Sequence, residues 1–252
     1  MGNEGAYLYD STAHNMDDPR QIVPLLYQYF SHASVVDLGC GIGNFLHEFK
    51  DCGVKHVLGI DGAWSDNDQQ MLTGTDLLLK NLNEDLGDNG RFELAISLEV
   101  AEHLDKKYAE KLIQDLADLS DVIVFSAAIP GQGGQDHINE QWPEYWAQLF
   151  NNLGYDCYDV MRPLLWNNPK VSFWYKQNMF VAVNRANMAQ VAQLEDNFPF
   201  IQNNKNVISS LVHPLLFDAK ISQNKHFIRL LKGKGSFSEY KTELLRFFAK
   251  RN

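Results

Sequence analysis

Short apolar runs alternate with amphipathic segments along most of the chain. The run 34–38 is rich in β-branched residues and ends at glycines, as expected of a buried strand. The segment 44–50 places Phe45, Leu46 and Phe49 on one face of a helix. The same alternation continues to about residue 184. It predicts helices at 22–30, 44–50, 106–119 and 142–153, and strands at 34–38, 56–60, 77–80, 92–98, 121–126, 155–161 and 173–183.

The order of these segments predicts an α/β fold. Strands that alternate with helices build a mostly parallel sheet with helices on both faces. The last two strands, 155–161 and 173–183, are separated by too few residues for a crossover helix, so this pair is expected to be antiparallel. Residues 185–252 do not continue the alternation and are predicted to form a helical C-terminal appendage. Its packing face would contain Tyr240, Leu244, Leu245 and Phe248.

The charge is distributed unevenly. The whole chain has a net charge of −10, but residues 220–252 carry nine Lys or Arg and two acidic residues. Because an acidic protein repels phosphate backbones, a nucleic-acid partner is not expected. The basic tail could dock on the acidic body, contact a partner, help to hold an anionic substrate, or form a solvated helix face.

The composition also bears on the compartment. No apolar run approaches the roughly 20 residues that span a bilayer, so no membrane partner is expected. No secretory signal is visible at the N-terminus. Cys40, Cys52 and Cys157 form no CxxC pair, which fits a reducing compartment. We therefore expect a cytoplasmic protein, and leave open whether it forms a homodimer.

The most informative segment is VVDLGCGIGN at 35–44, a strand followed by a GxGxG turn and the start of a helix. Its glycines allow a tight turn and the close approach of a ligand to the backbone. An NAD fingerprint would need a glycine where Asn44 stands, and Asp37 suits a cationic ligand better than a pyrophosphate. Asp61, at the end of the next strand, can accept hydrogen bonds from both hydroxyls of a ribose, although it could also be a strand-end or N-cap acid.

The DLGCGIG stretch resembles motif I of class I S-adenosylmethionine (SAM) dependent methyltransferases, and the resemblance extends to about residue 184. The segment ELAISLEVAEHL at 93–104 resembles the fourth-strand motif of ubiquinone-type and other small-molecule O-methyltransferases. The resemblance implies a Rossmann-like, seven-stranded, mostly parallel sheet whose last strand is antiparallel. It also implies that SAM is the cofactor and S-adenosylhomocysteine the product.

The resemblance assigns SAM-binding roles position by position. Asp37 would lie close to the methionyl amine, and Asp61 would hold the ribose hydroxyls. Asn81 stands where the family commonly has an Asp facing the adenine amine, and its side-chain oxygen can accept the same hydrogen bond. The cofactor-binding residues expected on this basis are Asp37, Gly39, Cys40, Gly41, Gly43, Asp61, Asn81, Leu82, Ser97 and Leu98.

Two histidines follow predicted strands, where the active site should open. His103 comes after the fourth strand and His137 lies in the loop PGQGGQDHINEQW at 130–142, which is similar to stretches of other methyltransferases of this type. Methyl transfer to a hydroxyl of high pKa requires an aligned acceptor and a base, for which His is the usual choice. We predict His137 as the general base; the alternative is a loop histidine with local hydrogen bonds. The candidate catalytic residues are His137, His103 and Glu99.

The EVAEH segment has a second interpretation. Glu99, Glu102 and His103 would suit Mg²⁺ or Mn²⁺ if the strand end bends so that they converge. In ubiquinone-type relatives this motif is associated with a divalent ion, whereas many relatives have it without one. The alternative is that these acids cap and pack at the start of a helix.

The chain is therefore expected to have three parts: an N-terminal lid and first helix at 1–30, a SAM-binding core at 31–184, and a basic helical extension at 185–252. Tyr7, Tyr9 and His14 would belong to the lid. We expect methyl transfer to a small polar acceptor, at a hydroxyl oxygen of a sugar, a nucleotide-linked sugar or a similar metabolite.

Other functions stay open. One alternative is N-methylation of a small amine or a protein, although SLEVAEH stands where one type of amine site has an (N/D)PPY-like motif. Another is a non-catalytic, SAM-binding partner subunit. A nicotinamide oxidoreductase is disfavoured by Asn44.

Overall fold

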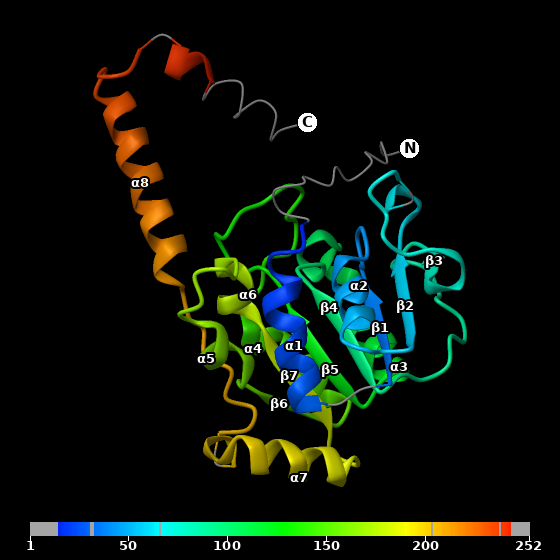
Figure 1. Ribbon diagram of the computed structural model, residues 1–252. Coiled ribbons are helices and arrows are strands. Elements are labelled where there is room, and N and C mark those ends of the chain that lie inside the picture. Colours follow the sequence, from blue (N-terminus) through cyan, green and yellow to red (C-terminus); the bar gives the residue numbers. More distant parts are fainter. Residues whose placement is uncertain (1–14, 31–32, 66, 203, 237, 243–252) are drawn as a thin grey trace. The chain divides into compact units, whose positions relative to one another are not determined.

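The computed structural model describes residues 15–30, 33–65, 67–202, 204–236 and 238–242 of the chain (Figure 1). It divides into two compact units between Leu211 and Val212. Among the described residues, no helix combines the length and the apolar character that crossing a membrane requires.

A seven-stranded sheet lies at the centre of the first unit, in the order β3-β2-β1-β4-β5-β7-β6 (Figure 1). Strand β7 is antiparallel to both β5 and β6, whereas the other neighbouring strands are parallel. The predicted Rossmann-like sheet with an antiparallel last strand is thus confirmed. The strands are β1 (Ser34–Leu38), β2 (His56–Asp61), β3 (Leu77–Leu79), β4 (Leu94–Leu98), β5 (Val122–Ser126), β6 (Tyr155–Tyr158) and β7 (Phe180–Asn184).

Helices cover both faces of this sheet. Successive residues of a strand point to opposite sides, and both sides of these strands are apolar, so each face needs a covering layer. Val35 packs in one apolar cluster with Leu26 of α1, and the adjacent Val36 packs in the other with Leu112 of α3. The helices of the first unit are α1 (Pro19–Phe30), α2 (Asn44–Asp51), α3 (Ala109–Leu119), α4 (Pro143–Asn152), α5 (Met161–Leu165), α6 (Phe173–Asn178) and α7 (Met188–Asn197). Short 3₁₀ turns occupy Ala63–Ser65, Gly74–Asp76, Ala101–His103, Lys106–Tyr108 and Pro199–Ile201.

The predicted strand 173–183 is wrong in its first half. Residues Phe173–Asn178 form α6, and β7 begins only at Phe180. The aromatic residues of this segment favour strands intrinsically, but tertiary contacts override that preference. At the start of α6, Asp18 accepts hydrogen bonds from the backbone N–H of Ser172 (2.6 Å) and from its hydroxyl (2.7 Å). The preceding predicted strand also ends early, at Tyr158, before α5 begins.

The first unit extends beyond residue 184, where the core was expected to end. Helix α7 places Leu194 in the apolar cluster of α1, and Phe198 packs on Tyr29 with 4.7 Å between ring centroids. These contacts hold residues 185–211 on the sheet domain.

The second unit contains α8 (Pro214–Leu231), which agrees with a helical C-terminal piece. Leu216 and Leu230 are its buried side chains. Tyr240 of the predicted packing face donates a hydrogen bond to the carbonyl of Leu230. The other three residues predicted for that face, Leu244, Leu245 and Phe248, lie outside the described residues.

Candidate active site

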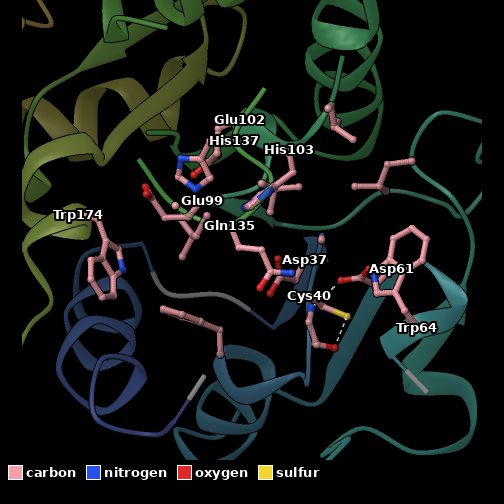
Figure 2. Close-up of a pocket in the computed structure, with 18 of the residues that line it drawn as sticks. Asp37, Cys40, Asp61, Trp64, Glu99, Glu102, His103, Gln135, His137 and Trp174 are labelled. Carbon is pink, nitrogen blue, oxygen red and sulfur yellow. Dashed lines mark hydrogen bonds between the residues drawn. The ribbon is translucent and has the colours of Figure 1, made fainter. Parts of the chain in front are cut away.

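A cavity of about 500 Å³ opens beyond the carboxyl ends of β1, β2 and β4, where open α/β sheets bind ligands. Figure 2 shows Asp61 and Trp64 on one side of it and Glu99, Glu102 and His137 on the other. Most of the predicted site residues line this one cavity. They are Asp37, Gly39, Cys40, Gly41, Asp61, Asn81, Leu82, Leu98, Glu99, His103 and His137.

Two predicted cofactor residues lie elsewhere. Gly43 precedes α2 and lies under Leu72, whose Cγ would be 2.4 Å from a Cβ at residue 43. Ser97 is fully buried and donates a hydrogen bond to the carbonyl of Leu38 at 2.9 Å. Tyr7, Tyr9 and His14, predicted for the lid, lie outside the described residues.

The glycine turn after β1 is fixed by backbone geometry and by one carboxylate. Gly39 has a φ of +84°, and a Cβ there would lie 2.4 Å from Cγ2 of Val100, so only glycine fits without displacement. Asp61 accepts hydrogen bonds from the N–H of Gly41 (2.7 Å) and of Gly62 (2.6 Å). The carboxylate predicted to hold a ribose therefore also holds the turn that would receive the ligand.

Asp37 and Asp61 place two buried carboxyl groups at this end of the cavity. Burial raises the pKa of Asp37 well above the usual range, and the nearby charge of Asp61 raises it further. Two buried carboxylates without a cation are costly, because each disfavours the ionised form of the other. The pair is thus suited to a ligand that carries a positive charge.

The outer part of this end contains Trp64 and residues 81–83. Trp64 folds its indole over Gly62, where a Cβ would lie 2.2 Å from the ring. The Oδ1 atom of Asn81 accepts a hydrogen bond from the N–H of Asn83 at 3.0 Å. An adenine amine would therefore share this oxygen with the backbone.

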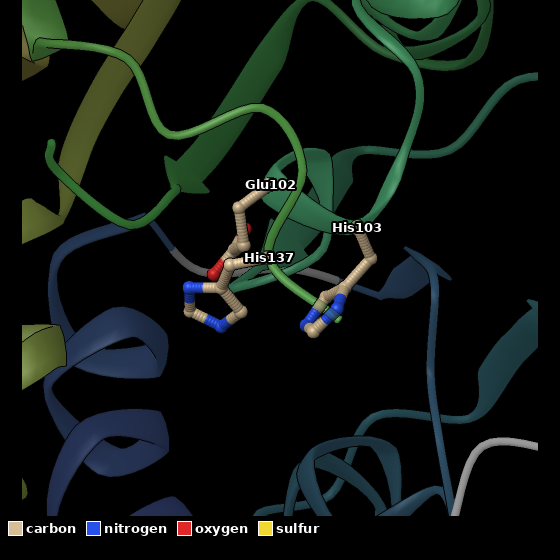
Figure 3. Close-up of side chains that lie close together, drawn as sticks. All are labelled: Glu102, His103 and His137. Atoms are coloured by element: carbon tan, nitrogen blue, oxygen red, sulfur yellow. The ribbon is translucent and has the colours of Figure 1, made fainter. Parts of the chain in front are cut away.

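The opposite end holds an acid–histidine cluster of Glu102, His103 and His137 (Figure 3). Each residue offers one atom that could bind a metal, a carboxylate oxygen or an imidazole nitrogen, and these three atoms lie within 4.8 Å of one another. The two imidazole rings are perpendicular, with 4.8 Å between their centroids. Burial raises the pKa of Glu102 well above its usual range, and the neighbouring Glu99 raises it further. Neither carboxylate oxygen of Glu102 makes a hydrogen bond of normal geometry to the described residues.

Glu99 is not a member of this cluster, although it was predicted to join Glu102 and His103 as a ligand. Its carboxylate accepts hydrogen bonds from Nδ2 of Asn178 (2.9 Å) and Nε2 of Gln132 (3.0 Å). Burial raises its pKa, while these amides and Ser126 oppose the shift. Its φ of +57° is unusual for a residue with a side chain and turns the chain from β4 toward the cluster.

The loop after β5 reaches the cluster through backbone contacts. The N–H groups of Ile138 and Asn139 both donate to the carbonyl of Glu102, at 2.9 and 3.0 Å. The Asn139 side chain also donates to the carbonyl of Ala101. The loop is thereby pinned to the 3₁₀ turn that carries Glu102 and His103, which explains why His137 lies beside them.

Four aromatic residues that the sequence patterns did not assign to the site also line the cavity: Phe45, Trp64, Trp174 and Tyr175. Trp174 and Tyr175 were assigned to a strand, whose alternation gave no reason to place them at the site. The one sequence feature that could have indicated them is the run of adjacent aromatic residues before the last strand.

A family model described as a methyltransferase domain matches residues 13–164. The chain belongs to this family of methyltransferase domains. No curated protein matches the sequence of this chain.

Solved structures share its fold. A sugar N-methyltransferase from Streptoalloteichus sp. is 14% identical with a TM-score of 0.55, and the match covers 73% of this chain and 96% of that one. Magnesium protoporphyrin IX methyltransferase from Synechocystis, solved with bound S-adenosylhomocysteine, is 15% identical with a TM-score of 0.49, covering 71% and 90%. An O-methyltransferase family protein from Burkholderia thailandensis is 12% identical with a TM-score of 0.48, covering 66% of this chain and 57% of its own.

Proposed function

We propose that this methyltransferase uses SAM to methylate a hydroxyl oxygen of a small polar acceptor. The observation that carries the proposal is a single cavity that joins two chemically different ends. The buried Asp37 and Asp61 lie beside the glycine turn at one end, and His137 lies with Glu102 and His103 at the other. A cofactor and an acceptor can therefore meet within one cavity.

The residues at the first end fit SAM. Gly39 and Gly41 line the cavity without side chains, so a ligand can lie against the backbone of the turn. Asp37 would face the positively charged methionyl part, Asp61 would accept from the ribose, and Trp64 would cover the adenine. When bound, SAM supplies an electrophilic methyl group on a sulfonium.

The residues at the second end would prepare the acceptor. His137 would accept the hydroxyl proton as the new O–CH₃ bond forms and S-adenosylhomocysteine leaves. Phe45, Trp174 and Tyr175 line the cavity with aromatic surface that would exclude water from the reacting atoms. Gln135 adds polar lining, which supports a hydroxyl-rich acceptor such as a sugar or a nucleotide-linked sugar.

A divalent ion is a second candidate for the same cluster. The two Glu102 oxygens, buried and without normal hydrogen bonds to the described residues, fit a cation next to two imidazoles. Glu102, His103 and His137 would hold Mg²⁺ or Mn²⁺, which would act as a Lewis acid toward the acceptor oxygen. A His137 nitrogen that binds a metal cannot accept a proton, so the two roles are alternatives.

Release of S-adenosylhomocysteine from a library of polar metabolites, including nucleotide sugars and amino sugars, tests the proposal. We expect turnover with a hydroxyl acceptor. If EDTA leaves turnover intact and His137→Ala abolishes it, His137 acts as the base; if EDTA abolishes turnover and Mn²⁺ restores it, the cluster is a metal site. Methylation of amines alone would contradict the O-methyl assignment, and a lack of SAM binding would contradict the whole proposal.

A further inference from the structure

We infer that Glu140 is a positioning residue that fixes the tautomer and orientation of His137. The catalytic part of this inference rests on the function proposed above, whereas the structural part does not. Glu140 lies in the loop 130–142, but the sequence predicted no role for it, and it does not line the cavity. It acts through the histidine beside it.

The contacts of Glu140 involve both of its oxygens. Oε2 accepts a hydrogen bond from the N–H of Gly131 at 2.7 Å, and Oε1 accepts one from the N–H of Gly133 at 2.6 Å. Nδ1 of His137 lies 3.1 Å from the same Oε1. Both side chains are largely shielded from solvent, with 11% of His137 and 18% of Glu140 exposed. One carboxylate thus ties the glycine loop and the imidazole together.

These contacts determine where the imidazole proton lies. An ionised carboxylate can only accept hydrogen bonds, and its partners at Gly131 and Gly133 are both donors. Nδ1 of His137 must therefore carry a proton to complete the third contact. In a neutral imidazole, that leaves Nε2 with the free lone pair.

The second nitrogen lies beside Gly134. A Cβ at residue 134 would lie 2.2 Å from Nε2 of His137, so the imidazole packs against the backbone here and only glycine leaves room for it. Gly134 and His137 both line the cavity. Nε2 would serve either as proton acceptor or as metal ligand, and both roles require the Nδ1–H tautomer. A carboxylate that orients a functional histidine in this manner typically contributes 10- to 100-fold to affinity or activity.

The competing explanation is that Glu140 only clamps the loop. A clamp would matter for stability but would not determine the tautomer of His137. A long-range ¹H–¹⁵N spectrum of ¹⁵N-histidine-labelled protein separates the two, recorded about two pH units above the ordinary His pKa of about 6.5. The spectrum of His137→Gln identifies the His137 signals.

We expect His137 to be in the Nδ1–H form in the wild type. In Glu140→Ala the signals should move to the Nε2–H form or to an exchange average, while Glu140→Gln, whose amide oxygen can still accept, should keep more of the Nδ1–H form. Asp136→Asn is the matched control, because Asp136 lies in the same loop, is exposed, and accepts a hydrogen bond from Nε2 of Gln135. A wild-type Nε2–H form, or an unchanged tautomer in Glu140→Ala, would overturn the inference.

A double-mutant cycle tests the catalytic consequence. Glu140→Ala should lower kcat about 10- to 100-fold with little change in the Kd of SAM. In the His137→Ala background the same substitution should have no further effect, because Glu140 acts through His137. Equal losses in both backgrounds would show that it is only a clamp. If no acceptor is methylated at all, the proposed function fails, but the spectrum still decides the tautomer.

Discussion

The cofactor end of the cavity is lined largely by residues within 37–41 and 61–64, whereas the acid–histidine end is lined by residues within 98–104, 133–137 and 174–175. At the first end, two short turns follow neighbouring parallel strands, and Asp61 bridges them. At the second, a loop of glycines and amides is pinned onto the turn after β4. The first end is determined by local geometry and the second by tertiary contacts, so substitutions should affect them separately.

The largest expected effect is at the second end. His137→Ala should reduce kcat by about 10²–10⁴-fold, because a general base or a metal ligand is lost. The Kd of SAM should stay unchanged, since His137 lies away from the glycine turn. Steady-state kinetics and calorimetry measure the two quantities. With Asp136→Asn as the control, unchanged turnover in His137→Ala would remove this residue from the mechanism.

A substitution at the glycine turn should disturb the first end. Gly39→Ala combines a positive φ with a clash against Val100 at 2.4 Å. The left-handed conformation alone costs about 1–2 kcal/mol of folding free energy. In a chain of this length, each kcal/mol lowers Tm by roughly 2–4 °C. Gly154→Ala is a matched control, because it has a φ of +89° with nothing within 4 Å of the added Cβ.

Both glycine variants should therefore be less stable in thermal denaturation. Only Gly39→Ala should also bind SAM more weakly, because Gly39 lines the cavity and Gly154 does not. Equal SAM affinity in the two variants would show that the turn does not receive the cofactor.

Asp37 should give the first end a pH dependence. Its folded-state pKa is raised by burial and by Asp61, so the folded protein binds more protons than the unfolded chain between about pH 3.9 and that raised pKa. The contribution of Asp37 to the free energy of unfolding of the ligand-free protein therefore falls as pH rises through that window. Asp37→Asn should raise the Tm of the ligand-free protein by a few degrees at neutral pH.

The same carboxylate should affect ligand binding in the opposite direction. Below its raised pKa, Asp37 must lose a proton to face a cation, so SAM affinity should increase with pH through the window and then level off. Asp37→Asn should bind SAM more weakly and remove this dependence. Calorimetric titrations across the pH range would refute the assignment if wild type and variant showed the same profile.

The smallest expected effect concerns metal binding. If the cluster holds Mn²⁺, the ion should raise the Tm of the wild type, because a ligand that binds only the folded state stabilises it. Glu102→Gln should reduce that increase, while the control substitution Glu110→Gln, outside the cluster, should not. An equal increase in all three proteins would place the ion elsewhere.

The sequence predicted the first end well because its chemistry is local. A strand, a GxGxG turn and an acid at the next strand end lie within 30 residues, and the structure brings Asp37, Gly39, Gly41 and Asp61 to one cavity. Ser97 does not line the cavity, because a strand residue has two faces and the pattern did not determine which one points there.

The second end was predicted only in part. The convergence of His103 and His137 depends on hydrogen bonds from Ile138 and Asn139 to Glu102, which no local pattern encodes. The position of Glu99 depends on a hydrogen bond from Asn178, which lies 79 residues away in the sequence. Asn178 belongs to α6, whose aromatic composition had predicted a strand. Tertiary packing determined both features, so residue spacing alone could not.

Calorimetry with SAM on the wild type, Asp61→Ala and His137→Ala tests the central claim most directly. The account predicts that the wild type and His137→Ala bind SAM equally. Asp61→Ala should bind about 10- to 100-fold more weakly, because hydrogen bonds to a charged group contribute roughly 1.5–3 kcal/mol. Binding that is unaffected by Asp61→Ala, or NAD binding in place of SAM, would contradict the account.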